Sequence, residues 1–181
     1  MAEAGDGGST PDGPCARRRY PLRISSPDQM VADIGHVHLR VADLERSVRF
    51  YRLLGFEVRK EMDGAVFLAF GGYHHHLALN TWASSRDALP TASTIGLHHF
   101  AVRYRDRRDL GGVVRAILAA DIAIESTSDC GGIADSVYVR DPDGNGVELT
   151  WDRPLDRRPV PLPDTDRPLD LDELCAADRR L

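Results

Sequence analysis

The sequence of 181 residues has no long apolar run and only three cysteines, and each absence excludes a class of protein. No segment approaches the roughly 18 consecutive apolar residues of a membrane-spanning helix, and the first residues lack the apolar core of a secretion signal. Cys15, Cys130 and Cys175 are odd in number and form no close pair, which excludes a disulfide framework and is typical of a reducing compartment. We therefore expect a cytoplasmic protein that has no membrane partner.

Charge and size narrow the possibilities further. The formal net charge is −5, and a short basic cluster, Arg17-Arg18-Arg19, lies in an N-terminal stretch rich in Gly, Pro and Ser. This balance argues against a nucleic-acid partner, and we interpret the cluster as a solvated charge run. Hydrophobic residues make up 42% of the chain, which suits one domain or two small modules that share a core.

The histidines are unevenly distributed, because all seven lie between positions 36 and 99. Imidazole at this density indicates metal binding or proton transfer. A triplet of histidines enters a run that otherwise has the character of a buried strand, so we do not interpret it as a tag or a low-complexity tract. The seven residues are His36, His38, His74, His75, His76, His98 and His99.

The order strand–helix–strand–strand–strand occurs twice along the chain. In the first copy, Asp43 is expected to cap the helix and Gly55 to end it in a left-handed conformation. The second copy contains an apolar helical pattern over 110–118. The predicted strands cover 34–41, 56–61, 65–70 and 75–82 in the first copy, and 95–104, 122–125, 136–140 and 146–151 in the second.

We therefore predict an α+β fold of two tandem βαβββ modules, residues 33–82 and 95–151, within one domain over residues 31–153. Their mixed sheets are expected to curve into a shared metal-binding bowl, with the helices on the outside. Residues 1–30 are expected to form a flexible arm. The Pro-, Asp- and Arg-rich residues 154–181 are expected to form a tail along the surface.

The duplication selects three candidate metal ligands. Superposing the repeats by their strand–helix junctions places His36 opposite His98, and the stretch 76–78 opposite the stretch 148–150. Strand alternation turns His36 and Glu148 toward the face without a helix. If the sheets form one bowl, His36, His98 and Glu148 converge inside it. Two imidazoles and one carboxylate leave about three positions open on a metal, which is the pattern of non-haem Fe(II) oxygenases.

Two motifs give the chain a family resemblance. One is Gly35-His36-Val37-His38-Leu39-Arg40-Val41 followed by Asp43-Leu44-Glu45-Arg46-Ser47, and the other is the run 141–149, Asp-Pro-Asp-Gly-Asn-Gly-Val-Glu-Leu. Over about residues 33–153 the sequence resembles the vicinal oxygen chelate superfamily, which includes glyoxalase I, antibiotic-resistance proteins and extradiol dioxygenases. The resemblance implies a small-molecule site built on a divalent metal.

Two further stretches resemble the ring-cleaving branch, of the catechol 2,3-dioxygenase type. They are 137–144 followed by Glu148, and His74-His75 followed by Leu77-Ala78. This resemblance implies an enzyme, an extradiol dioxygenase that holds Fe(II) and uses O2 to cleave a catechol-like ring. It makes His75 the acid/base group and Tyr138 a hydrogen-bond donor to substrate oxygen. Strand alternation instead turns His76 into the bowl, so both histidines remain candidates.

One position departs from the extradiol pattern. Cys130 stands where the resemblance leads us to expect a second active-site histidine. A thiol does not supply the cationic imidazolium of that histidine, so this substitution weighs against ring cleavage. By itself Cys130 can also be interpreted as a small buried hydrophobic residue.

Other members of the superfamily supply two alternative functions. A glyoxalase-like lyase or isomerase would hold Zn(II), Ni(II) or Mn(II) with four protein ligands, and His76 aligns where its fourth ligand, a glutamate, is expected. A non-catalytic resistance protein would hold a planar drug in the bowl.

Two βαβββ units suffice for one bowl, either within one chain or by exchange between two chains. We expect a homodimer because homodimers are the commonest oligomers.

Overall fold

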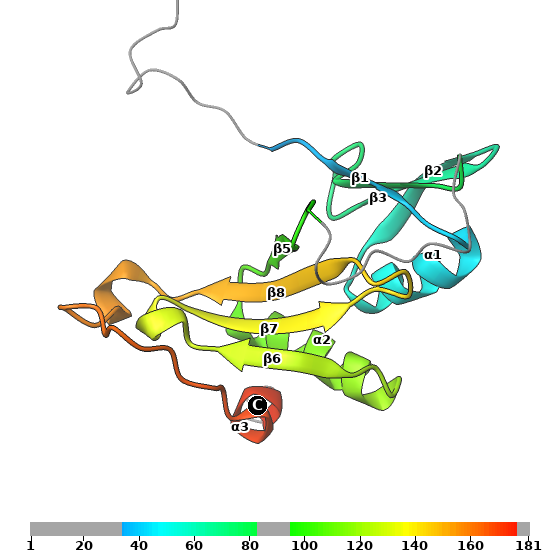
Figure 1. Ribbon diagram of the computed structural model, residues 1–181. Helices are drawn as coiled ribbons and strands as arrows, with labels where there is room; N and C mark the ends of the chain where they lie inside the picture. The colour runs from blue at the N-terminus through cyan, green and yellow to red at the C-terminus, as the bar shows by residue number, and fades with distance from the viewer. Residues whose placement is uncertain (1–33, 83–94, 177–181) are drawn as a thin grey trace, which may run out of the picture. The chain divides into compact units, whose positions relative to one another are not determined.

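The computed structural model describes residues 34–82 and 95–176, which contain two separate four-stranded mixed sheets (Figure 1). The predicted arm over residues 1–30 lies outside the described residues. In each sheet the first strand of the module pairs in parallel with the last strand, and the other pairs are antiparallel. The two strand orders, β1-β4-β3-β2 and β5-β8-β7-β6, are therefore the same topology written twice.

The first module runs from residue 34 to residue 82. Its two central strands consist mainly of small and apolar residues, and the buried side chains of these strands pack against the module's helix. Its elements are β1 (Val37–Arg40), α1 (Leu44–Leu53), β2 (Glu57–Met62), β3 (Ala65–Ala69) and β4 (Leu77–Asn80).

The second module repeats this order and adds a short turn before its third strand. The turn, η2, crosses from the edge strand to the centre of the sheet. The elements are β5 (Phe100–Arg103), α2 (Arg107–Ala119), β6 (Ile124–Ser128), η2 (Cys130–Gly132), β7 (Ala134–Arg140) and β8 (Gly146–Asp152).

The two long helices begin with the same cap. The side chain of Asp43 accepts a hydrogen bond from the backbone N–H of Arg46, and that of Asp106 accepts one from the N–H of Arg108, each over 2.9 Å. Both aspartates satisfy a backbone donor that has no partner within the helix. Gly55 follows α1 with φ +92°, a conformation that glycine adopts at no steric cost. The cap and the terminator of α1 are as predicted.

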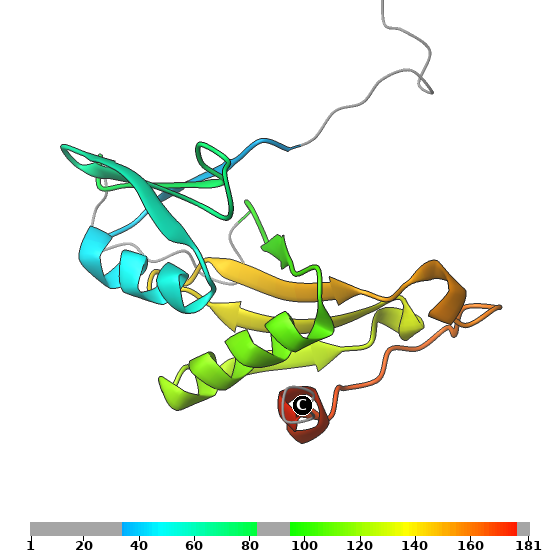
Figure 2. The same cartoon turned by 180° about the vertical axis from the view of Figure 1, so that it is seen from behind.

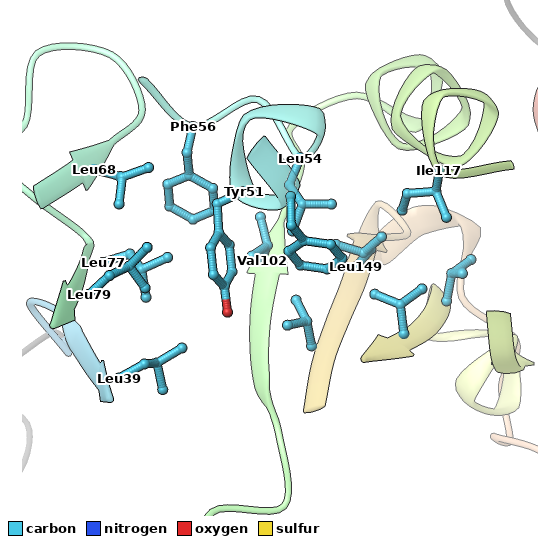
Figure 3. Packing of buried hydrophobic residues seen from close by; sticks show 14 of the residues in the cluster. Leu39, Tyr51, Leu54, Phe56, Leu68, Leu77, Leu79, Val102, Ile117 and Leu149 are labelled. Atoms are coloured by element: carbon cyan, nitrogen blue, oxygen red, sulfur yellow. The ribbon is translucent and has the colours of Figure 1, made fainter. Parts of the chain in front are cut away.

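One hydrophobic core connects the two modules (Figure 3). Tyr51 of α1 and Leu54, which caps the end of that helix, lie between Leu79 of β4 and Leu149 of β8. Ile117 of α2 packs into the same core. All five residues are fully buried. Figure 2 shows α2 lying across one face of the second sheet. The apolar faces of both sheets therefore point to this core, and the opposite faces carry the polar residues.

The chain continues after β8 through η3 (Leu155–Arg157) and passes along the edge of the second sheet. Asp129 and Arg167 are joined by two hydrogen bonds. The backbone N–H of Asp129 donates to the carbonyl oxygen of Arg167 over 2.8 Å, and the backbone N–H of Arg167 donates to Oδ1 of Asp129 over 2.9 Å. The segment ends in α3 (Leu171–Ala176), whose Leu174 is fully buried. These contacts attach the segment to the second module along its length.

The α+β class and the two βαβββ modules are confirmed. The two sheets do not close on each other, so the described part of one chain does not complete the bowl by itself. The first strand of the second module is shorter than the predicted 95–104, because pairing with β8 begins at Phe100. No helix among the described residues has the length and apolarity needed to cross a membrane.

Candidate metal centre

The second module brings a histidine and a carboxylate together on the open face of its sheet. Nε2 of His99 lies 3.1 Å from Oε2 of Glu148, and their side chains are 33% and 15% exposed. Glu148 lies on β8 between Val147 and Leu149, which are buried in the core. Alternation along the strand therefore turns its carboxylate to the open face, as the sequence predicted.

His98 contacts the ring nitrogen of His99 that does not face Glu148. Its Nδ1 lies 2.8 Å from Nδ1 of His99, so the other ring nitrogen of His99, Nε2, is the one that faces Glu148. A neutral His99 with its proton on Nδ1 would donate to His98 and leave the lone pair of Nε2 for a metal. A hydrogen bond on the second ring nitrogen is the usual support of a metal-binding histidine.

A glycine sets the spacing between the strands that carry this pair. A side chain at Gly146 would collide with the carbonyl oxygen of His98 and approach the Cβ of His99 to 2.9 Å. The absence of a Cβ therefore allows the start of β8 to lie against the segment that carries both histidines.

The first module places a second pair of imidazoles on its own open face. The ring centroids of His36 and His75 are 4.5 Å apart, and His75 also makes an edge contact with Phe67 at 5.1 Å. Phe67 lies on β3 between two buried core residues, so its ring belongs to the face away from α1. His75 is therefore the member of the triplet that accompanies His36.

The other two members of the triplet take different positions. His76 accepts a hydrogen bond from the backbone N–H of Phe70 and packs against the ring of Tyr73. Its ring also approaches Phe70, which packs against the core residue Phe56. The Nδ1 atoms of His74 and His75 are 2.6 Å apart. Strand alternation favoured His76 and the family resemblance favoured His75, but β4 begins only at Leu77, so alternation along that strand does not decide between them.

Burial and neighbouring rings lower the pKa of two members of the triplet, His75 and His76. Desolvation, followed by the imidazoles of His36 and His74, lowers the pKa of His75 below its usual value of 6.5. Desolvation, followed by His74, lowers the pKa of His76 in the same direction. A neutral His75 can accept a proton from a ligand that binds beside it.

The repeat correspondence differs from the one expected from sequence. His36 precedes the capping residue Asp43 by the same spacing that separates His99 from the capping residue Asp106. The sheet registers agree, because Val37 pairs with Leu77 and Phe100 pairs with Val147. His36 therefore corresponds to His99 and not to His98. The same registers place Ala78, and not His76, at the position of Glu148.

Sequence reasoning thus missed His99, although the spacing from each histidine to the helix cap carries the signal. Among residues 34–82 and 95–176, no three His, Cys, Asp or Glu side chains are close enough to hold a metal ion together. The described chain joins His99 with Glu148 and His36 with His75, and it does not bring the two pairs into one group. The ligand roles of His36, His98 and Glu148 stay predictions.

Tyr138 and Cys130 both lie near Glu148. The hydroxyl of Tyr138 donates to Oε1 of Glu148 over 3.2 Å, and its ring makes an edge contact with His99. Desolvation and the charge of Glu148 raise the pKa of Tyr138 to about 12, so the phenol remains a donor. The thiol of Cys130 lies 3.5 Å from Oγ of Ser136, whose hydroxyl in turn bonds Glu148. Cys130 therefore reaches the carboxylate through one intervening residue.

Comparison with known sequences finds related proteins. The family model described as "Glyoxalase/Bleomycin resistance protein/Dioxygenase superfamily" matches residues 33–149. Catechol-2,3-dioxygenase of Bacillus subtilis is 37% identical over 122 residues, which are 67% of this chain and 42% of that protein. A putative lactoylglutathione lyase of Brassica oleracea is 31% identical over 139 residues, 71% of this chain and 45% of that protein. The match spans less than half the length of each relative.

Solved structures share the fold. A lactoylglutathione lyase from Agrobacterium tumefaciens has a TM-score of 0.52 at 26% identity, with 67% of this chain and 94% of that chain covered. A glyoxylase/bleomycin resistance protein/dioxygenase domain from Frankia has a TM-score of 0.56 at 23% identity, with 68% and 100% covered. The second similarity concerns the fold alone.

Proposed function

This chain belongs to the glyoxalase/bleomycin resistance protein/dioxygenase superfamily, and we propose that it is a metal-dependent extradiol-type dioxygenase that cleaves a catechol-like ring. His36, His99 and Glu148 would hold the metal, with His99 in the place that sequence alone gave to His98. Two neutral imidazoles and one carboxylate are a donor set suited to Fe(II), and Mn(II), Zn(II) and Ni(II) bind the same groups.

The observation that carries this proposal is the residue at the fourth position. Ala78 occupies in β4 the place that Glu148 occupies in β8. Its methyl group offers no donor, and His76, the other candidate for a fourth ligand, packs against Phe70 and Tyr73. The remaining set of three ligands leaves coordination positions for substrate and O2, whereas a glyoxalase-like site takes four protein ligands.

A second copy of the chain would complete the site. One chain joins His99 with Glu148 and holds His36 apart with His75. We therefore propose a homodimer in which the first module of one copy faces the second module of the other. Such an arrangement forms two equivalent sites, because a two-fold interface uses the same surfaces on both copies.

The residues around the metal have separable tasks. The metal that His36, His99 and Glu148 would hold would supply one centre at which both catechol oxygens and O2 can bind, so that the reaction would become effectively intramolecular. His75, neutral and adjacent to His36, would take the proton of a catechol hydroxyl. General-base assistance of this kind typically contributes about 10² to 10⁴-fold. Tyr138, beside His99, would transfer its single hydrogen bond from Oε1 of Glu148 to a substrate oxygen when substrate binds.

The overall reaction balances without an external reductant. The ring carbon–carbon bond next to a hydroxyl-bearing carbon breaks, and both atoms of O2 enter the product. One becomes part of a carboxyl group and the other the oxygen of an aldehyde or ketone. The ring supplies all four electrons, and the product retains every atom of the catechol and of O2.

An assay of the purified, Fe(II)-loaded protein with a panel of catechols tests this proposal. We expect ring-cleavage absorbance and equimolar O2 uptake with at least one catechol, and loss of both in Glu148→Ala. Absence of both signals for the whole panel, with iron bound, would overturn the dioxygenase assignment.

The similarity to lactoylglutathione lyases supports one alternative, a divalent-metal lyase or isomerase that does not use O2. It predicts full activity under anaerobic conditions and a native metal other than iron. Metal analysis of protein purified anaerobically distinguishes the two functions.

A further inference from the structure

The two oxygens of the Glu148 carboxylate have different surroundings. Oε1 accepts hydrogen bonds from the hydroxyl of Ser136 over 2.7 Å and from that of Tyr138 over 3.2 Å. Oε2 lies 3.1 Å from Nε2 of His99. One oxygen is therefore occupied by two protein donors, and the other faces the ring nitrogen of the neighbouring candidate ligand.

Counting donors assigns a direction to these hydrogen bonds. An ionised carboxylate only accepts, so the single proton of the Ser136 hydroxyl points to Glu148. The hydroxyl of Thr150, 2.9 Å from Oγ of Ser136, must then donate to it. The thiol of Cys130 donates to the same oxygen over 3.5 Å. The order of donation is therefore from Thr150 and Cys130 to Ser136, and from Ser136 to Glu148.

This chain of hydroxyl groups is enclosed. Ser136 is fully buried, Thr150 is 7% exposed, and the Glu148 side chain is 15% exposed. Ser136 lies on β7 and Thr150 on β8, where they face each other in the register of the sheet. Little water reaches these hydroxyls, so the protein itself must satisfy the bond to Oε1, and hydrogen bonds in such surroundings are electrostatically stronger than in water.

We propose that Ser136, supported by Thr150, is a positioning residue that holds Oε1 of Glu148 and reserves Oε2 as the single metal-binding oxygen. This inference rests on the proposed metal site. Donors on Oε1 withdraw electron density from that oxygen and oppose its approach to a metal. They also fix the rotation of the carboxylate, so that Oε2 stays beside His99. Partners of this type typically change metal affinity by about 10- to 100-fold when they are removed.

Cobalt(II) titration of the metal-free full-length protein tests the inference, because Co(II) reports both affinity and coordination by its visible absorption. We expect Ser136→Ala to weaken Co(II) binding by about 10- to 100-fold. Its absorption bands should weaken and move, because the freed Oε1 can join Oε2 on the metal and raise the coordination number. Thr150→Val should change the spectrum in the same direction with a smaller loss of affinity.

Two controls separate positioning from a structural effect. Thr150→Ser keeps the hydroxyl and should retain the wild-type spectrum, whereas Thr150→Val keeps the shape and should not. Ser126→Ala removes an exposed hydroxyl from β6, the neighbouring strand, and should have no effect. Thermal unfolding of each variant shows whether it is folded.

The outcomes are distinct. If the wild-type protein does not bind Co(II), or Glu148→Ala binds it equally well, the proposed metal site is wrong and this inference falls with it. If the wild type binds and Glu148→Ala does not, while folded Ser136→Ala and Thr150→Val match the wild type in affinity and spectrum, only the role of Ser136 is overturned.

Discussion

Tyr51 and Asp141 join the two modules through a buried hydrogen bond, in which the tyrosine hydroxyl donates to Oδ2 of the aspartate over 2.8 Å. Tyr51 belongs to α1 of the first module, and Asp141 begins the tight turn between β7 and β8 of the second. The same turn accepts three more bonds from the first module. Asp143 receives the hydroxyl of Ser47 and the backbone N–H of Ala42, each over 3.2 Å, and the guanidinium of Arg46 over 2.5 Å. The aspartates of this turn therefore connect the modules.

Removing the Tyr51 hydroxyl should destabilise the protein without changing its shape. Burial and the charge of Asp141 raise the pKa of Tyr51, which favours the protonated phenol that donates this bond. We expect Tyr51→Phe to reduce the free energy of unfolding by about 1.5 to 3 kcal/mol, the range for a bond to a charged group. Urea denaturation measures this. Tyr73→Phe, on an exposed tyrosine, should change it by far less; equal losses would contradict the assignment.

The adjacent histidines His98 and His99 should have unequal roles. His99→Ala should abolish measurable binding of Co(II), because it removes a proposed ligand. His98→Ala should weaken binding by about 10- to 100-fold, because it removes only the acceptor that orients His99. Isothermal titration of the metal-free variants measures both effects, with His38→Ala as a matched control from the first module. The reverse ranking of His98 and His99 would return the ligand role to His98.

Mixing two inactive variants tests whether two copies share a site. His36→Ala and Glu148→Ala should each be inactive as pure proteins. If each site takes His36 from one copy and Glu148 from the other, a mixed dimer has one intact site and one doubly altered site. Random exchange should then recover about a quarter of the wild-type activity, because half of the dimers are mixed and each keeps one of two sites.

Recovery should appear only after the subunits have exchanged, for example after dilution from mild denaturant and refolding together. A mixture that is shown by mass spectrometry to contain mixed dimers and yet remains inactive would mean that each site is built within one chain.

Stability should fall in acid because of Asp129. The backbone N–H and the guanidinium of Arg167 hold the pKa of this carboxyl below its usual value of 3.8, although burial acts in the opposite direction. A carboxyl whose pKa is lower in the folded protein than in the unfolded chain stabilises the fold above the pKa of the unfolded chain. This stabilisation is lost as the pH falls through the pKa of the folded protein. Between about pH 6 and pH 3, the melting temperature of Asp129→Asn should therefore fall by less than that of the wild type.

Thermal unfolding across that range measures the difference. The substitution Asp164→Asn, on an exposed residue of the same C-terminal segment, is the matched control and should follow the wild-type profile. If Asp129→Asn shows the full acid loss of the wild type, another carboxyl is responsible.

Local patterns in the sequence predicted most of the fold. The cap at Asp43, the left-handed Gly55 and the alternation that turns Glu148 to the open face depend on neighbouring residues, and each is found. The duplication was visible for the same reason. Packing between the two sheets depends on contacts distant in sequence, so the sequence left open whether one chain or two complete the bowl, and the two sheets of the described chain do not close on each other.

The candidate site is harder to derive from sequence than the fold, because it depends on strand register. His98 and His99 are equally plausible when the start of a strand is judged from hydrophobicity, and only the spacing to the capping residue Asp106 distinguishes them. His75 and His76 could not be separated by alternation, because the strand that would impose it starts after them. In both cases a shift of one residue reverses the face of the strand, so the roles of these histidines stay predictions.

Gly146 has a consequence for how this site can change over generations. Its missing side chain accommodates the carbonyl oxygen of His98, two residues before β8 presents Glu148. Almost any substitution at this codon would push apart the strands that carry His99 and Glu148, although neither residue would itself be altered. Relatives that keep both residues but replace this glycine are therefore the ones in which metal chemistry should first be doubted.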